Sequence, residues 1–268
     1  MELFQRVKVW LMENTVLFFR IILALTFSGH GLVSLGFSPG YELHYRIFSA
    51  VNYFDFPAEL ALKALGVFDL SMALCCLFGI ALRYSLALAI FYLLMVAGAG
   101  WVFFNHKTGL VFGFAESFRR FAWIFYALFL WIYTFRGKKY YTLLRMGIAF
   151  AFLAHGLASL GLFGLKGGHI ELASQILSED VANKMVFYSG YTDTLLGSLL
   201  LIGFFSRQAA TIGALWLVVV VVLSFMIAVP DGIFRTGFLL SCVYVAVDSR
   251  CHDKGIIYYI TTLFKSQK

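Results

Sequence analysis

Eight runs of mostly apolar residues, each close to the roughly 20 residues that a bilayer-crossing helix needs, follow one another along this chain. They cover approximately residues 15–36, 60–80, 84–104, 117–135, 142–163, 185–205, 208–228 and 233–248. Only 13% of the residues are charged and the mean hydropathy is +0.86, a balance that water-soluble domains do not keep. The runs are also too long for the short alternating strands of a porin-type barrel. The sequence therefore predicts an all-α integral membrane protein with eight transmembrane helices.

Positive charges are distributed unevenly between the two ends of the predicted spans. Eight spans place both termini on one side, and with the termini inside, thirteen of the 21 Lys and Arg residues lie on inner segments. These thirteen are Arg6, Lys8, Arg20, Arg83, Arg136, Lys138, Lys139, Arg145, Arg207, Arg250, Lys254, Lys265 and Lys268. The positive-inside rule then predicts a cytoplasmic (inner) membrane protein with cytoplasmic N and C termini. Cations spread between apolar spans do not form a basic stripe, so we do not expect nucleic acid as a partner.

The two ends of the chain differ from the apolar spans. Residues 1–14 mix charges with apolar residues at helical spacing, which predicts an amphipathic leader in the membrane interface and no removable signal peptide. Residues 251–268 form a basic tail that we expect to be cytoplasmic. The longer outer segments after the first and fifth spans favour a short surface helix each.

The chain also contains an internal repeat carried by polar residues. Arg20 is followed ten residues later by His30, and Arg145 is followed ten residues later by His155, an offset of 125 between the pairs. At an offset of 124, Asp69, Gly79 and Arg83 match Asp193, Gly203 and Arg207. At an offset of 115, Glu116 and Arg120 match Asp231 and Arg235. Agreement in both type and spacing among rare polar residues is strong evidence for a repeat. We predict two four-helix bundles, residues 15–136 and 137–250, as a tandem parallel repeat about an axis along the membrane normal.

These motifs resemble the DoxX/DoxD-like family of small bacterial membrane proteins. In that family the first span begins with an arginine and ends in a glycine-containing turn, and the second span carries an acid, two glycines and an arginine at fixed spacing. Asp193, Gly197, Gly203 and Arg207 reproduce the second pattern whole, whereas Ala73 replaces its first glycine in the other half. The resemblance covers about residues 15–248 and is firmer in the second half. It implies an association with quinone-linked respiratory or sulfur-oxidising electron transfer.

Ionisable residues within the spans are the candidate site, because a charge near the bilayer centre costs about 3 kcal/mol on insertion scales and needs a partner. At a rise of about 1.5 Å per residue, His30, Asp69 and Arg120 share one layer in the outer half of the membrane, as do their counterparts in the other half. The candidates for a ligand or proton network are His30, Asp69, Glu116, Arg120, His155, Asp193, Asp231 and Arg235. We expect one His-Asp-Arg set to converge in each bundle. The same sets could instead serve as structural locks between helices.

Four arginines, Arg20, Arg83, Arg145 and Arg207, form a helix-end motif that marks the inner boundary of the membrane. The glycines near His30, including Gly29 and Gly31, favour close helix packing over ligand binding. The four cysteines form no CxxC pair and lack the convergent partners of a metal site, so we expect neither a disulfide framework nor a metal.

The expected function is that of an accessory or quinone-interacting subunit of a membrane redox complex. The chain carries no cofactor motif, so a quinone is the one cofactor considered, and enzymatic activity would require a membrane or soluble redox subunit beside the lipid bilayer. Two other classes fit the sequence: a non-catalytic scaffold or chaperone, and a small-solute transporter. Neither half shows the broken span typical of transporters. Whether His30 and His155 line a cavity or are buried against backbone separates the redox class from the scaffold class.

Overall fold

The computed structural model of the chain describes residues 2–50, 57–99, 112–162 and 166–252, and all regular secondary structure in these ranges is helical. Each of the eight predicted spans overlaps one long helix. These helices are α2 (Thr15–Ser34), α4 (Ala58–Phe78), α5 (Leu82–Ala99), α7 (Phe112–Arg136), α8 (Thr142–Ser159), α10 (Glu179–Ile202), α11 (Ser206–Ile227) and α12 (Val229–Val247). The end of the third predicted span (100–104) and the tail beyond residue 252 lie outside the described residues.

Five of these helices, α2, α4, α8, α10 and α11, are by themselves long and apolar enough to cross a bilayer. Helix α5 is apolar but shorter. Helices α7 and α12 carry Arg120 and Arg235, respectively, in their first halves, and these charges shorten the apolar stretch that follows. The chain is therefore a multi-pass, all-helical membrane protein.

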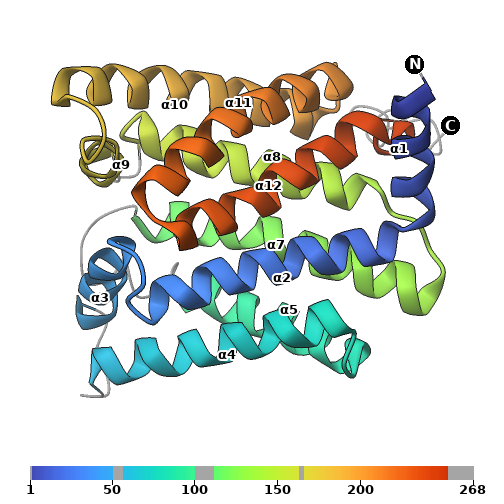
Figure 1. Ribbon diagram of the computed structural model, residues 1–268, viewed down its shortest axis with the longest axis horizontal. Helices are drawn as coiled ribbons and strands as arrows, with labels where there is room; N and C mark the ends of the chain where they lie inside the picture. Colours follow the sequence, from blue (N-terminus) through green and yellow to red (C-terminus); the bar gives the residue numbers. More distant parts are fainter. Residues whose placement is uncertain (1, 51–56, 100–111, 163–165, 253–268) are drawn as a thin grey trace, which may run out of the picture.

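Three short helices lie at the ends of the long ones. Helix α1 (Glu2–Glu13) runs across one end of the bundle, almost perpendicular to the long helices, whereas α3 (Gly40–Ala50) and α9 (Lys166–Ala173) lie at the opposite end (Figure 1). Helices α3 and α9 confirm the surface helices expected after the first and fifth spans. The crosswise position of α1 is the geometry expected of an interfacial amphipathic helix.

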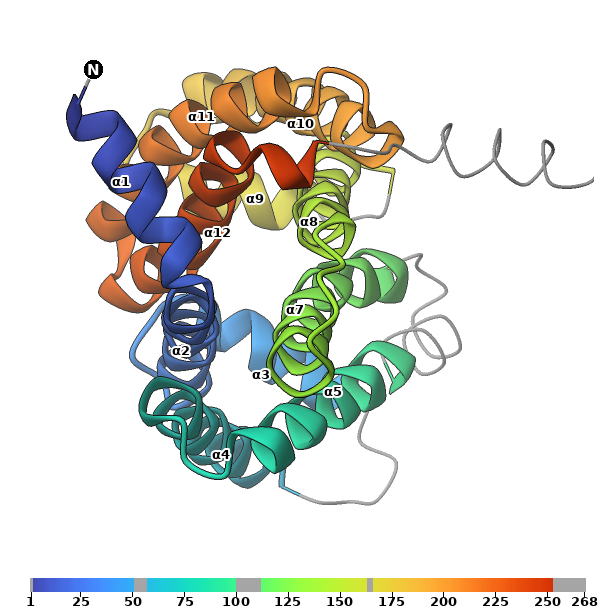
Figure 2. The same cartoon turned by 90° about the vertical axis from the view of Figure 1, so that its right-hand side faces the viewer.

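The eight long helices follow one another around a ring in chain order, and the ring closes where α12 packs on α2 (Figure 2). Helix α2 also contacts α7, and α8 contacts α12. The first four long helices (α2, α4, α5 and α7) are called the first bundle below, and the last four (α8, α10, α11 and α12) the second bundle. The two bundles meet along two seams, α7 with α8 and α12 with α2. Residues from both bundles can therefore reach sites near these seams.

Buried aromatic side chains join the two bundles. The ring of Phe19 on α2 lies 5.0 Å from the ring of Tyr244 on α12 and 5.3 Å from that of Phe129 on α7. The ring of Trp123 on α7 lies 4.1 Å from that of Phe238 on α12. The side chains of these rings other than Phe238 are at most 1% exposed. Aromatic pairs at such distances contribute about 0.5–1.5 kcal/mol each beyond the area they bury, so this core stabilises the association of the bundles.

Glycines permit close crossings at matching places in the two bundles. A side chain at Gly31 would come within 2.9 Å of the Gly66 carbonyl, where α2 crosses α4. At the crossing of α8 and α10, a side chain at Gly156 would come within 2.9 Å of the Gly190 carbonyl. These contacts confirm that Gly31 serves helix packing.

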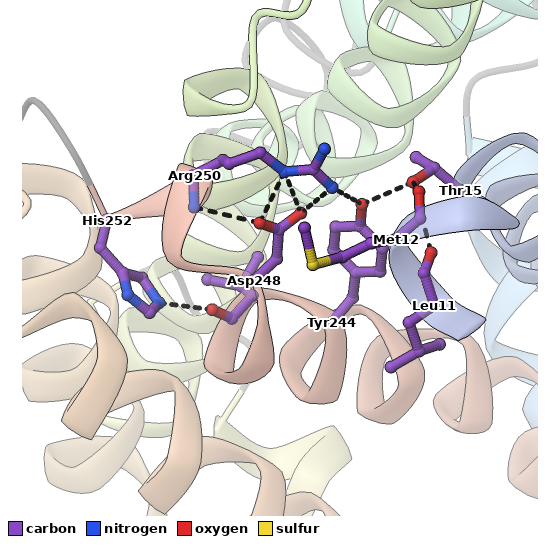
Figure 3. Close-up of polar contacts among 8 residues, drawn as sticks. Leu11, Met12, Thr15, Tyr244, Asp248, Arg250 and His252 are labelled. Carbon is purple, nitrogen blue, oxygen red and sulfur yellow. Dashed lines mark hydrogen bonds and ion pairs between the residues drawn. The ribbon is translucent and has the colours of Figure 1, made fainter. Parts of the chain in front are cut away.

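A polar cluster ties the start of α2 to the end of α12 (Figure 3). The hydroxyl groups of Thr15 and Tyr244 are 2.8 Å apart, and Arg250 Nη2 donates to the Tyr244 hydroxyl at 3.3 Å. Arg250 also donates to both carboxylate oxygens of Asp248, at 2.8 and 2.6 Å. Burial alone lowers the pKa of the Arg250 guanidinium, but the hydrogen bonds and negative charge of Asp248 raise that pKa above its ordinary value. The cluster fixes the two ends of the ring beside α1.

Candidate functional site: two unequal polar clusters

The first bundle brings His30, Asp69 and Arg120 into one hydrogen-bonded cluster. These residues come from α2, α4 and α7, which are neighbours in the bundle. His30 Nδ1 lies 2.6 Å from Asp69 Oδ2, and Arg120 Nη2 lies 3.2 Å from His30 Nε2. Asp69 is 1% exposed. The grouping inferred from matched depth is therefore present in the first bundle.

The donors in this cluster determine the tautomer of His30. A guanidinium group has only donors, so His30 Nε2 must accept the hydrogen bond from Arg120. The proton of a neutral imidazole then resides on Nδ1, from which it is donated to Asp69. His30 thus connects a carboxylate and a guanidinium whose charges offset each other, which reduces the cost of burying both.

Other aromatic side chains close this first cluster. The ring of His44 on α3 lies 5.2 Å from that of His30, and Tyr92 on α5 lies beside the Asp69 carboxylate. Only a cavity of about 10 Å³ remains between these groups and Trp123. Such a space is too small for an organic ligand, because it has about the volume that one water molecule needs.

The second bundle contains a much larger cavity, of about 170 Å³. His155, Asp193 and Arg235 all line it, together with apolar side chains from α8, α10, α11 and α12 and from the segment around α9. Aromatic walls come from Phe152, Trp216 and Phe238. A few polar groups in a mostly apolar cavity are typical of small-molecule sites.

The members of the second His-Asp-Arg set are not hydrogen-bonded to one another as those of the first set are. Asp193 Oδ1 accepts a hydrogen bond from Trp216 Nε1 at 3.0 Å, and Arg235 Nη1 donates to Asp231 Oδ1 at 3.2 Å on its own helix. Asp231 also accepts a short hydrogen bond from Ser38 of the first bundle. The three side chains therefore line one cavity without a hydrogen bond to one another, because each charged group is bound by a different neighbour.

His155 is the member of this set that remains available to a ligand. Its ring stacks on that of His169, with centroids 5.9 Å apart, and touches the ring of Phe238 edge-on at 6.5 Å. Within the described part of the chain, its imidazole forms no side-chain hydrogen bond. Because His155 also lines the cavity, its ring nitrogens can donate to or accept from a bound molecule.

An arginine of the first bundle reaches the second cluster. Arg119 Nη2, on α7, donates to His169 Nε2 at 2.9 Å, and His169 Nδ1 lies 2.8 Å from Ser159 Oγ. Because Arg119 can only donate, His169 carries its proton on Nδ1 and donates it to Ser159. This chain of contacts attaches α9 to α7 and α8, and it places His169 at the wall of the cavity.

Sequence reasoning missed four residues of these clusters. His44 and His169 contact the paired histidines of their own bundles, and Tyr92 and Trp216 lie beside the paired aspartates. The signal that could have found them is the repeat itself, since His44 and His169 are 125 residues apart and Tyr92 and Trp216 are 124 apart. A histidine in a predicted surface helix, or an aromatic residue in an apolar span, does not by itself indicate a site.

The arginines of the helix-end motif lie away from both clusters. Arg20 donates from Nε to the Cys76 carbonyl at 2.9 Å and from Nη2 to the Leu77 carbonyl at 2.6 Å, so it caps the last turn of α4. Gly79 ends that helix at φ +70°, and a side chain there would meet Arg20 at 2.8 Å. The motif thus has a capping role in the first bundle.

The remaining motif arginines differ in burial. Arg145 is 1% exposed, and Arg83 and Arg207 are exposed near the start of α5 and α11. The side chain of Glu116 lies outside the described residues.

A comparison with protein-family models matches part of the first bundle. Residues 24–107 match the model of the DoxX-like family, a segment that includes the second half of α2 and all of α4 and α5. The expected firmer resemblance in the second half is not reflected in this match, which lies wholly in the first half. Searches of curated proteins and of solved structures found no significant match. The apolar helices show that the chain is a multi-pass membrane protein, and its residues 24–107 are similar to the DoxX-like family.

Proposed function

We propose that this protein is an accessory subunit of a membrane redox complex, and that its second bundle binds the head group of a quinone. The observation that carries the proposal is the cavity of about 170 Å³ beside His155. A quinone head group is a flat apolar ring with two hydrogen-bond acceptors, so it requires aromatic or aliphatic walls and a donor. Phe152, Trp216 and Phe238 supply such walls, and the His155 imidazole supplies such a donor.

Access from the lipid phase supports the same ligand class. Helices α10 and α11 form part of the cavity wall, and α10 packs mainly on α8 whereas α11 packs mainly on α12. The outward faces of these two helices are apolar, with Leu195 61% and Val222 55% exposed. A ligand dissolved in the bilayer would meet this face first, and quinones are such ligands.

The two bundles would have different roles. The closed cluster of His30, Asp69 and Arg120 would hold α2, α4 and α7 together through hydrogen bonds, which is a structural role. The open cluster in the second bundle would bind the ligand. The chain itself would carry no other redox group, so electron transfer would require a membrane or soluble partner subunit.

The proposal includes the membrane arrangement. All eight long helices would cross the bilayer as a tandem parallel repeat of two four-helix bundles, with both termini cytoplasmic. The polar offsets in the sequence support the repeat, as do the glycine crossings at Gly31 and Gly156. The arginine and lysine residues near the end that carries α1 support the orientation.

Quenching of tryptophan fluorescence tests the proposal. The purified protein in nanodiscs is titrated with a benzoquinone carrying a decyl tail, which quenches Trp216 when it occupies the cavity. Val220→Trp projects into the cavity from α11, and Val219→Trp, next to it but 47% exposed, is the matched control. We expect saturable quenching in the wild type and in Val219→Trp, and its loss in Val220→Trp.

Two further measurements define the outcome. His155→Ala should weaken the saturable quenching, and Trp216→Phe should remove most of its amplitude. Equal binding by Val220→Trp and the wild type would refute the cavity as the site. Absence of both quinone and a redox partner from protein purified in mild detergent, as judged by mass spectrometry, would favour the scaffold class instead.

A further inference from the structure

One carboxylate oxygen in the first bundle has no direct partner. Asp69 is 1% exposed, and its Oδ2 accepts the hydrogen bond from His30. No donor of the described residues lies within hydrogen-bond distance of its other oxygen, Oδ1. A buried carboxylate oxygen without a hydrogen-bond donor is unfavourable, because the oxygen has lost its contacts with water and gained none in return. A further polar group is therefore required at this position.

The space beside Asp69 has the size of one water molecule. The cavity there measures about 10 Å³, and a single water needs roughly 10–15 Å³ by the same kind of measure. It is lined by Thr26 and Tyr92 as well as Asp69, and Tyr92 lies next to the carboxylate. The Thr26 hydroxyl donates its proton to the Ile22 carbonyl at 2.8 Å, which leaves its lone pairs as acceptors.

The second bundle shows how the same position is satisfied without a water. Trp216 occupies the place that corresponds to Tyr92, and its Nε1 donates directly to Asp193 Oδ1 at 3.0 Å. The indole Nε1 can only donate, whereas the Tyr92 hydroxyl can donate or accept. The Tyr92 hydroxyl lies beside the Asp69 carboxylate, yet Asp69 Oδ1 has no hydrogen-bond partner among the described residues.

We infer that the cavity between Asp69, Tyr92 and Thr26 is a binding site for one ordered water molecule. The water donates one hydrogen bond to Asp69 Oδ1 and a second to the Thr26 hydroxyl, and it accepts a hydrogen bond from the Tyr92 hydroxyl. It completes the hydrogen bonding of the Asp69 carboxylate inside the membrane. The inference concerns the first bundle and does not depend on quinone binding in the second.

Radiolytic hydroxyl labelling followed by mass spectrometry tests this inference, because buried side chains next to a bound water are labelled faster than their exposure predicts. Tyr92 and Phe27 line the cavity, and Phe129, which is 0% exposed, does not line it and has no polar side-chain atom, is the internal control. In the wild-type protein in nanodiscs we expect Tyr92 and Phe27 to be labelled several-fold faster than Phe129, relative to the intrinsic reactivity of each side chain. Labelling of both at the relative rate of Phe129 would overturn the inference.

Two variants examine the water itself. Tyr92→Trp copies the second bundle and should supply a direct donor to Asp69, so labelling of Phe27 should fall to the control rate while the unfolding temperature is kept or raised. Tyr92→Phe removes one partner of the water, and it should slow Phe27 labelling and lower the unfolding temperature. Unchanged Phe27 labelling in folded Tyr92→Trp would contradict the proposed site. Should Tyr92→Trp fail to fold, the wild-type comparison and Tyr92→Phe still decide the question.

Discussion

Arg119 donates a hydrogen bond to His169 across the seam between the two bundles, with 2.9 Å between Nη2 and Nε2. The next residue on the same helix, Arg120, donates to His30 within the first bundle. Two consecutive arginines of α7 therefore contact histidines of different halves. This arrangement links the closed cluster of the first bundle to the open cavity of the second through one helix.

The hydrogen bond from His169 to Ser159 provides a test of this link. Ser159→Ala removes the acceptor for His169 Nδ1 and should destabilise the protein by about 1–3 kcal/mol, the cost of leaving a buried donor unsatisfied. Ser189→Ala is the control, because Ser189 lines the same cavity but donates to Val186 on its own helix. Unfolding in detergent, followed by circular dichroism, measures both. Equal stability of the two variants would argue against the proposed tautomer of His169.

The two paired histidines should differ in their contribution to stability. His30→Ala removes the imidazole that connects Asp69 with Arg120. It should lower the free energy of unfolding by about 3–5 kcal/mol, the range for breaking a buried charged network. His155→Ala removes ring contacts only and should cost clearly less. Thermal unfolding of both variants in the same detergent measures the difference. A larger loss for His155→Ala would mean that the structural lock lies in the second bundle.

Glycine at the crossing of α2 and α4 should be required for packing. Gly31→Ala places a methyl group 2.9 Å from the Gly66 carbonyl and should lower stability by about 1–3 kcal/mol, as overpacking does. Gly98→Ala on α5, where nothing lies within 4 Å, is the matched control and should be neutral or slightly stabilising. Midpoints of denaturant unfolding report both changes. A tolerated Gly31→Ala would show that the helices can separate at this crossing.

Reporter fusions should reveal both termini in the cytoplasm. The exposed residues Arg136, at the end of α7, and Lys138 and Lys139, between α7 and α8, belong to the side predicted to be inside. A fluorescent protein that folds only in the cytoplasm should therefore be active at the C terminus and after Lys138. Alkaline phosphatase should be active when it is fused within α3, near Glu42. An active phosphatase at the C terminus would reverse the orientation.

Much of the site could be predicted from the sequence because depth in the membrane follows from helical rise. His30, Asp69 and Arg120 were placed in one layer by counting residues from the ends of their spans, and they meet in the structure. The same count placed Asp193 at the depth of His155, yet these two side chains do not bond. Depth determines which residues can meet, whereas the direction in which each side chain points depends on how neighbouring helices are rotated.

The sequence by itself determined the helical membrane architecture, the positions of the long helices and the pairing of polar residues between the halves. These features depend on apolar length and residue spacing, which are properties of the chain alone. Only the tertiary structure decided that a cavity of about 10 Å³ lies between Tyr92 and Asp69 while Trp216 binds Asp193 directly, and that the large cavity lies in the second bundle. Such differences arise from the volume and reach of side chains on separate helices, which become neighbours only when the bundles pack.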